Sequence, residues 1–599
     1  MDILRTSSAK PPEPRARAAH AAPSLALAAA LSACLLIFAY QIWVYEFLTD
    51  DAFISFRYAR NLRDGYPLVF NPGFERVEGY TNLLWVLVLS SCQWLTGFEP
   101  HQTANWISAA AGLVLWGGTV AFCWRRERRG VGSWLVVVPA LWLALNRSAA
   151  VWSTSGLETK LFELLVVAAV LVGVREIERR ESRWWRPALL LALAALTRPD
   201  GLLFAGAFFA ARFGCEAYER RVDLAAAAKG ALLFAVVVGA QFAFRWAYYG
   251  EWLPNTYYAK LDGASWWDMG GLYLRTFLQE YGAPVWLPLV VVGAACRVWA
   301  GRPAATVLIG LTVASHALYV AYCGGDHFEY RPVDVYFPLL AVLLYDGLAF
   351  AAQRLGTAFA VAWAGASCLA VAVIPALSHL DFPSSYEPGF PGWHARADGN
   401  RDLVDLRRHP WLESVPGVSG YLRSYNSSFE ALSRQFVALR QEEHRGFLAT
   451  VEPEGVILGR MVNEGLLPRD THVAIPCVGA IPYFSGLRTL DELGLTDKVV
   501  ARQKMPPSAE RAMAHDKVAS YEYLAASGVD LIAPFMEPHL VTSDPEVVES
   551  WRRTARQAGP DSRLYLSKPV LGGHTVVAVI LAPDPHVRFP ALDLRPAWE

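Results

Sequence analysis

The most prominent pattern along the chain is a series of long apolar runs separated by short polar segments. A helix needs about 20 consecutive apolar residues to span a bilayer. Eleven runs approach that length and predict about eleven membrane-spanning helices: 24–47, 103–123, 131–147, 157–174, 187–197, 201–213, 224–247, 284–299, 304–323, 335–352 and 356–377.

The pattern changes after the last of these runs. Residues 378–446 are rich in Pro, Gly, Ser and charge, and predict a transition segment. From 447 to 599, short apolar runs alternate with turns. The stretches "THVAIPCVGAIPYFSG", "VDLIAPFM" and "HTVVAVILAP" predict buried strands, and "PSAERAMAHDKVASYEYLAAS" predicts a helical connection. The predicted fold class is an α-helical polytopic membrane protein (1–377, first outer loop about 48–102) with a C-terminal soluble α/β domain.

Composition agrees with a membrane protein and excludes one class of partner. The 599 residues are 54% hydrophobic and only 18% charged, with a mean hydropathy of +0.25. Soluble proteins carry about 25% charge. The net charge of −1 gives no basis for a nucleic-acid surface. Most of the eight cysteines fall in apolar runs, so they indicate neither a disulfide framework nor a zinc site.

Arginine positions predict the orientation, because Lys and Arg favour the cytoplasmic side. The run 82–98 would disturb this rule if it spanned, since "WRRERR" would then lie outside. We expect it to lie in the outer interface instead. The N-terminus is then cytoplasmic and everything after about 378 is outside, and the arginines that fall inside are Arg15, Arg17, Arg125, Arg126, Arg128, Arg129, Arg179, Arg180, Arg183, Arg220, Arg221, Arg297 and Arg302.

Five polar segments occur at the predicted outer ends of the spans. Ionisable groups at membrane depth need partners or a wet cavity, so their gathering on one face predicts a cleft beneath the outer domain. The segments are "FLTDDAFISFRYARNL" continued by "GYPLVFNPGFERVEGYTNLLW", "WSTSGLETKLF", "LTRPDGLL", "YYGEWLPNTYYAKL" and "YCGGDHFEYRPVDVYFP".

Each segment also has a purely structural interpretation. Asp50 and Asp51 are typical residues for the N-terminus of a helix. Arg198 and Asp200 could form a salt bridge within a tight turn. The "LPNTYYAK" stretch could belong to an interfacial aromatic belt, and His327 taken alone favours a hydrogen-bonded structural role over metal ligation.

These strings resemble the GT-C superfamily of polyprenyl-phosphate-dependent glycosyltransferases, and within it the terminal β-(1→2)-arabinofuranosyltransferases and their bacterial relatives. The resemblance covers nearly the whole chain. Its motifs are "TDDAFISFRYARNL", "YPLVFNPGFERVEGYTNLLW", "SGLET", "LTRPDGLL", "WLPNTYYAK", "GGDHFEYRP" and, in the outer domain, "GAIPYFSGLRTLDELGLTD".

The resemblance implies a multi-pass enzyme of the bacterial inner membrane. Such an enzyme would move a sugar from a polyprenyl-phosphate donor to a glycan or glycolipid acceptor, with inversion. The reaction needs a general base for the acceptor hydroxyl. In the superfamily the first acid of such a pair usually matches the catalytic one, which points to Asp50, while the sequence itself leaves Asp51 open.

The departing phosphate needs cationic groups, because negative charge develops on it in the transition state. The candidate phosphate ligands are Arg331, Arg198, Lys260 and Arg57. Further residues expected in the substrate cleft are Glu78, Tyr80, Glu158, Asp200, Asn255, Tyr258, Asp326, His327 and Glu329.

Some superfamily members require a divalent cation, and oxygen-rich ligands suit Mg²⁺, Mn²⁺ or Ca²⁺. The candidate ligands for such a cation are Asp50, Asp326 and His327. Two alternative functions stay open: a lipid-linked sugar transporter or flippase, and a non-catalytic protein of the same fold that supports envelope or flagellar assembly.

Overall fold

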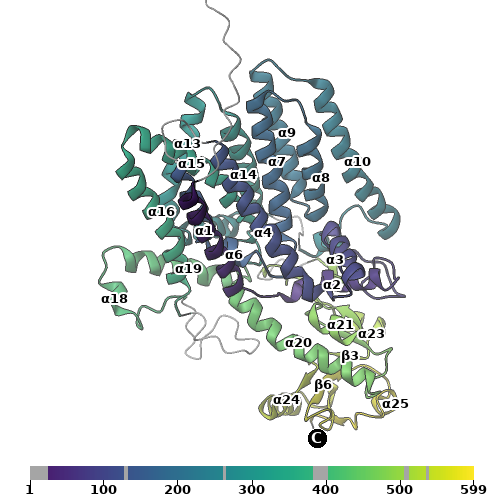
Figure 1. Cartoon of the computed structure of the whole chain (residues 1–599). Helices are drawn as coiled ribbons and strands as arrows, with labels where there is room; N and C mark the ends of the chain where they lie inside the picture. The colour runs from purple at the N-terminus through teal and green to yellow at the C-terminus, as the bar shows by residue number, and fades with distance from the viewer. Residues whose placement is uncertain are drawn as a thin grey trace, which may run out of the picture.

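The computed structural model describes residues 24–126, 133–260, 265–381, 403–504, 511–534 and 539–598. Arg15, Arg17, Arg128 and Arg129, used above for the orientation, lie outside these ranges, as do residues 382–402 of the predicted transition segment. Figure 1 shows two parts: a helical bundle and a smaller mixed domain below it, with α2 and α3 between them.

Helices occupy all eleven predicted apolar segments. Among the described residues, six of these helices are long and apolar enough to cross a membrane, or seven if a bent pair counts as one span. The bundle helices are α1 (Leu25–Val44), α4 (Pro100–Arg125), α5 (Val137–Ala144), α7 (Thr159–Arg179), α8 (Trp185–Thr197), α9 (Gly201–Tyr218), α10 (Leu224–Tyr249), α12 (Trp267–Glu280), α13 (Ala283–Trp299), α14 (Ala304–Cys323), α15 (Tyr336–Arg354) and α16 (Thr357–Ser378).

Local sequence explains several helix ends. At α4, Glu99 and Gln102 form a capping box and Pro100 occupies the first turn. At α14, Gly324 adopts a φ of 90°, which an L side chain rarely tolerates, and this ends the helix at the polar segment that follows. The pair α12 and α13 bends by 93° at Tyr281–Gly282.

Small residues set a close helix crossing in the bundle. A β-carbon on Gly293 of α13 would lie 1.9 Å from the Leu343 carbonyl oxygen of α15, and one on Gly347 would lie 2.0 Å from that of Leu289. Only glycine permits this approach, which is how membrane helices gain packing area without a hydrophobic driving force between them.

Short helices line the lower end of the bundle: α2 (Asp50–Arg63), α3 (Leu83–Thr96), α6 (Arg147–Val151) and α11 (Asn255–Lys260). The predicted interfacial run 82–98 is therefore a helix of 14 residues, and it packs mainly on α2. Below it, α19 (Val418–Arg434) and α20 (Gln441–Asn463) lead into the outer domain. Both begin within the predicted transition segment.

The outer domain contains a sheet, as predicted, and the sheet is mixed. Its strands run in the order β2-β1-β3-β6-β5-β7, with β4 also paired to β6. The strands are β1 (His472–Ile475), β2 (Arg488–Asp491), β3 (Leu531–Ile532), β4 (Val541–Thr542), β5 (Leu564–Leu566), β6 (Thr575–Ile580) and β7 (Arg595–Pro596). β1, β2 and β3 pair in parallel, and the β6 pairings are antiparallel.

Two details of the sequence-based assignment were wrong. The stretch 471–486 is a strand only over β1, because it turns at Gly479 into α21 (Ala480–Ser485). The stretch 507–527 is helical only over α23 (Tyr521–Ala526) within its described residues. Residues 511–519 instead form turns. The Met513 side chain packs against the bundle core, and its N–H donates to the carbonyl of Gln435, the residue that follows Arg434.

The two parts share one hydrophobic core. Phe53 and Tyr58 of α2 and Trp152 belong to the same buried cluster as Val473 of β1 and Leu531 of β3. Apolar burial of this kind contributes about 1.5–3 kcal/mol per large side chain. The outer domain is therefore fixed to the first outer loop.

Candidate active site

A cavity of about 300 Å³ lies between the bundle and the outer domain. All five predicted polar segments contribute to its wall, together with α14 and two residues of the outer domain, Leu495 and Met513. Its charged lining residues are Asp51, Glu158, Arg198, Asp200, Lys260, Asp326 and Arg331. The five segments, which lie far apart in the sequence, therefore meet at one cavity as predicted.

The two adjacent aspartates occupy different surroundings. Both stand in the first turn of α2, after Thr49. Because successive helix residues point about 100° apart, Asp51 lines the cavity and is half-buried, whereas Asp50 is buried against the outer domain.

Asp50 holds the turn before α21. Its Oδ1 accepts the Ala480 backbone N–H at 2.7 Å, and a β-carbon on Gly479 would lie 2.0 Å from the Asp50 carbonyl oxygen. Burial raises the pKa of Asp50 to about 7, opposed by the hydrogen bond from Ala480. Asp50 thus joins α2 to the outer domain instead of facing the cavity.

The α8–α9 turn carries a cluster of opposite charges. Arg198 donates from Nη2 to Asp200 at 2.9 Å and from Nη1 to Glu158 at 3.3 Å, and Nε also reaches Asp200. Asn82 donates to the other oxygen of Glu158 at 2.7 Å. All three nitrogens of the Arg198 guanidinium therefore already have carboxylate partners.

Arg331 and Lys260 keep donors available. Arg331 uses Nε to bind Asp326 at 2.9 Å and packs over Phe328, while its two terminal nitrogens bind no partner within the described ranges. Lys260 forms no hydrogen bond or ion pair with any described residue. Among the described cationic side chains of the cavity wall, Arg331 and Lys260 are therefore the two that still have N–H donors for a ligand.

Several residues expected in the cleft lie outside it and have structural partners. Glu78 receives Nε of Arg245 at 2.5 Å and Nη2 at 3.1 Å. Arg57 is buried and donates to the carbonyls of Phe70, Pro482 and Leu487. The amide of Asn255 donates to three outer-domain carbonyls, those of Gly494, Leu495 and Asp497.

Of the two aromatic residues expected in the cleft, one lines the cavity and the other does not. Tyr80 lines the cavity and its hydroxyl lies 3.1 Å from that of Tyr249. Tyr258 does not line it. The Tyr258 carbonyl accepts from Lys517 at 2.7 Å, and its ring receives Arg502 at 4.3 Å. The residues of α11 that do not face the cavity therefore anchor the outer domain.

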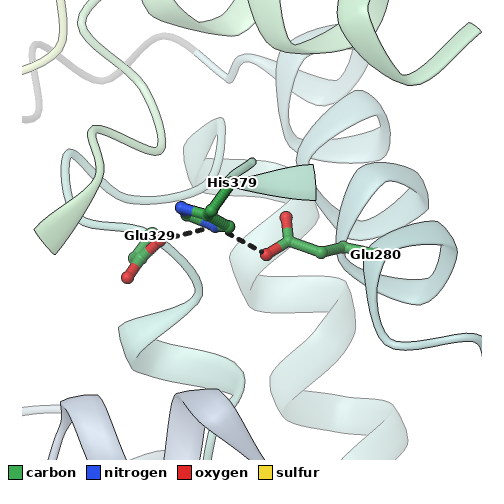
Figure 2. A group of neighbouring side chains, drawn as sticks. All are labelled: Glu280, Glu329 and His379. Atoms are coloured by element: carbon green, nitrogen blue, oxygen red, sulfur yellow. Dashed lines mark hydrogen bonds and ion pairs between the residues drawn. The ribbon is translucent and has the colours of Figure 1, made fainter. Parts of the chain in front are cut away.

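Glu329 belongs to a separate buried network. It receives Arg147 at 2.7 Å and Arg440 at 3.2 Å, and Arg440 also pairs with Glu280 at 3.0 Å. Figure 2 shows His379 between Glu280 and Glu329, at 3.3 and 4.0 Å. Although burial lowers the pKa of His379, nearby Glu442 and Glu280 raise it above its ordinary value.

The three residues proposed as metal ligands do not meet in one site. Asp50 faces the outer domain, Asp326 binds Arg331, and His327 places Nδ1 2.9 Å from the Phe436 carbonyl. Among described residues, the His and carboxylate atoms close enough to share an ion are those of Glu280, Glu329 and His379. Two arginines already neutralise that group, so its chemistry is that of a salt-bridge network.

Sequence reasoning missed several lining residues. His316 lies within an apolar span, with Nδ1 2.9 Å from the Tyr336 hydroxyl and Nε2 3.8 Å from Asp200. A histidine inside a predicted span is a signal that could have found it. Met513 carried no signal, because only the packing of the outer domain brings residues 511–519 to the cavity.

Comparison with known proteins shows which solved structures and sequences this chain is similar to. Residues 444–568 match a model described as a domain of unknown function, DUF8728. The fold is that of ArnT from Cupriavidus metallidurans: both its apo structure and its structure bound to undecaprenyl phosphate give a TM-score of 0.53 at 15% identity, over 93% of this chain and 98 or 99% of theirs. The predicted fold class, a polytopic helical protein with a C-terminal α/β domain, is confirmed.

Two curated proteins are similar in sequence, and both are named terminal β-(1→2)-arabinofuranosyltransferase. The protein from Corynebacterium glutamicum is 27% identical over 53% of this chain and 50% of its own length. The protein from Mycobacterium tuberculosis is 29% identical over 44% of this chain and 42% of its own length. The chain thus spans half or less of the relatives it matches. The resemblance drawn from the motifs is confirmed, over about half of this chain and not over nearly all of it.

Proposed function

We propose that this multi-pass membrane protein transfers a sugar, with arabinofuranose as the favoured candidate, from a polyprenyl-phosphate donor to a hydroxyl group of an envelope glycan or glycolipid. The observation that carries the proposal is one cavity holding a half-buried carboxylate, Asp51, with two cations that have unused donors, Lys260 and Arg331. The names of the similar proteins supply the sugar and the lipid carrier.

Asp51 is the base in this proposal. Its carboxylate takes the proton of the acceptor hydroxyl while the hydroxyl oxygen attacks the anomeric carbon. The bond between that carbon and the phosphate oxygen breaks, and its electron pair leaves with the polyprenyl phosphate. A single displacement of this kind inverts the anomeric centre.

Lys260 and Arg331 stabilise the leaving phosphate, because the terminal nitrogens of an arginine and a lysine ammonium match phosphate oxygens. Arg198 instead holds Glu158 and Asp200 in the wall. Asp50 and Arg57 connect α2 to the outer domain. No step of this scheme uses the divalent cation considered above, and that requirement stays a prediction.

The orientation is part of the proposal. The arginine distribution supports a cytoplasmic N-terminus and an outer domain on the periplasmic or extracytoplasmic side. A reporter that is active only outside the cytoplasm, fused after Glu599, should be active. If only a cytoplasmic reporter works at that position, the orientation is reversed.

The activity test uses purified full-length protein in lipid nanodiscs. It is incubated with polyprenyl-phosphate arabinofuranose and a short arabinofuranosyl oligosaccharide, and released polyprenyl phosphate is measured with and without the oligosaccharide. We expect release that depends on the acceptor, and its loss in Asp51→Asn. Movement of the lipid-linked sugar across vesicles, with no transfer to any acceptor, would instead support a flippase.

A further inference from the structure

A pair of histidines beside Asp51 has no role in the scheme above. His327 comes from the α14–α15 loop and His515 from the 511–519 loop of the outer domain, and their rings lie 5.4 Å apart. The cavity wall includes both chain neighbours of His327, Asp326 and Phe328, and also Met513, two residues before His515.

Backbone contacts fix the tautomer of both rings. Nδ1 of His327 lies 2.9 Å from the Phe436 carbonyl oxygen, and Nδ1 of His515 lies 2.8 Å from that of Met513. A carbonyl oxygen only accepts hydrogen bonds, so each Nδ1 must carry the proton and donate it. In each neutral ring, Nε2 is then left with a lone pair.

Both lone pairs are available. Within the described ranges neither Nε2 has a hydrogen-bond partner, and neither is among the fully buried polar atoms that lack one. Burial lowers the pKa of both imidazoles, that of His327 to about 3, so both rings are neutral near pH 7.

Two charged residues of the cavity wall, Asp51 and Lys260, act on the two imidazole rings. The negative charge of Asp51 acts on both rings and opposes the effect of burial, while Lys260 acts in the other direction. The Asp51 carboxylate and the two Nε2 atoms only accept hydrogen bonds. Asp51 lines the cavity, and each histidine lies within two residues of a lining residue.

We propose that His327 and His515 bind the hydroxyl groups of the acceptor glycan through Nε2 and hold it against Asp51. Groups that only accept hydrogen bonds repel phosphate oxygens and fit a ligand that brings several O–H donors, so these three groups suit the glycan, whereas Lys260 and Arg331 suit the phosphate. Because His515 belongs to the outer domain, that domain supplies part of acceptor recognition. The inference rests on the proposed function, which defines the acceptor as a glycan.

The asparagine and glutamine variants separate this role from a structural one. In His515→Asn, the side-chain N–H₂ can keep the bond to the Met513 carbonyl, but nothing replaces Nε2. His515→Gln can place an oxygen near the Nε2 position but loses the anchor. His327→Asn tests the second ring in the same way, and His586→Asn, on the exposed helix α25 (Pro585–Arg588), is the matched control.

We expect His515→Asn and His327→Asn each to raise KM for an arabinofuranosyl oligosaccharide about three- to tenfold, the effect of losing one neutral hydrogen bond. Donor KM, kcat and thermal stability should stay near wild type. His515→Gln should show the smaller rise in KM and the larger fall in stability. Wild-type KM in both asparagine variants, or an equal change in donor and acceptor KM, would overturn the inference.

Direct binding separates failure of this inference from failure of the proposed function. The same oligosaccharide is titrated calorimetrically into wild type and the variants, without donor. Binding that weakens in the asparagine variants supports the inference even if the wild type transfers no sugar, a result that would count against the proposed reaction alone. Equal binding by all variants, or none by the wild type, counts against the histidine pair.

Discussion

Replacing each aspartate of the adjacent pair by asparagine should produce opposite phenotypes. Asp51 lines the cavity, so Asp51→Asn removes the base without changing the shape of the side chain. Loss of a general base lowers rates by a factor of about 10²–10⁴, equivalent to roughly 3–5 kcal/mol of barrier. We expect that loss in kcat, with near-normal stability and donor binding.

Asp50→Asn should instead leave transfer largely intact and change stability. The asparagine carbonyl can still accept the Ala480 N–H, which Asp50 now accepts at 2.7 Å. The pKa of Asp50 rises from an ordinary value of 3.8 to about 7 in the folded protein. The folded state therefore binds more protons than the unfolded state across that range, and stability falls as pH rises through it.

The size of this change in stability follows from the rise in the pKa of Asp50. Each pKa unit corresponds to 1.36 kcal/mol, so ionised Asp50 costs up to about 4 kcal/mol above pH 7. Asp50→Asn should thus match wild type near pH 4 and be more stable at pH 8. Thermal unfolding of purified protein at both pH values, with transfer rates in parallel, measures this.

Two results would refute the assignment. If Asp50→Asn is inactive while Asp51→Asn transfers normally, the catalytic residue is the first of the pair. If both correctly folded variants transfer at the wild-type rate, the pair only caps α2. The base must then be sought among the other carboxylates of the cavity, Glu158, Asp200 and Asp326.

Three further changes test other parts of the structure. Lys260→Met should weaken donor binding and transfer together, because phosphate is present in ground and transition states; the exposed Lys568→Met is the control, and unchanged donor KM would contradict the phosphate role. Gly479→Ala should lower thermal stability, since its β-carbon would meet the Asp50 carbonyl; a wild-type melting temperature would show that this contact relaxes easily. Arg440→Met should destabilise by about 3–5 kcal/mol by leaving Glu280 and Glu329 undercompensated, and a neutral result in denaturant unfolding would show that the network is dispensable.

The sequence by itself determined the architecture. Apolar length can be read locally, because a bilayer demands a run of fixed size whatever the rest of the chain does. The change to short runs after 447 likewise predicted the mixed domain, and β6 follows the stretch 574–583 closely. The motifs also predicted which segments meet at the cavity, since ionisable groups at the ends of spans need a common polar site.

Only the tertiary structure decided the role of each residue in those segments. Asp50 and Asp51 are the same residue type at adjacent positions, so the sequence does not distinguish them. Asp50 contacts Ala480 and Asp51 lines the cavity because of where the outer domain packs on α2. Glu78 and Glu329 look like cleft acids until Arg245, Arg147 and Arg440 are seen to neutralise them. These partners lie more than 100 residues away along the chain, and a charge's availability depends on its neighbours in space.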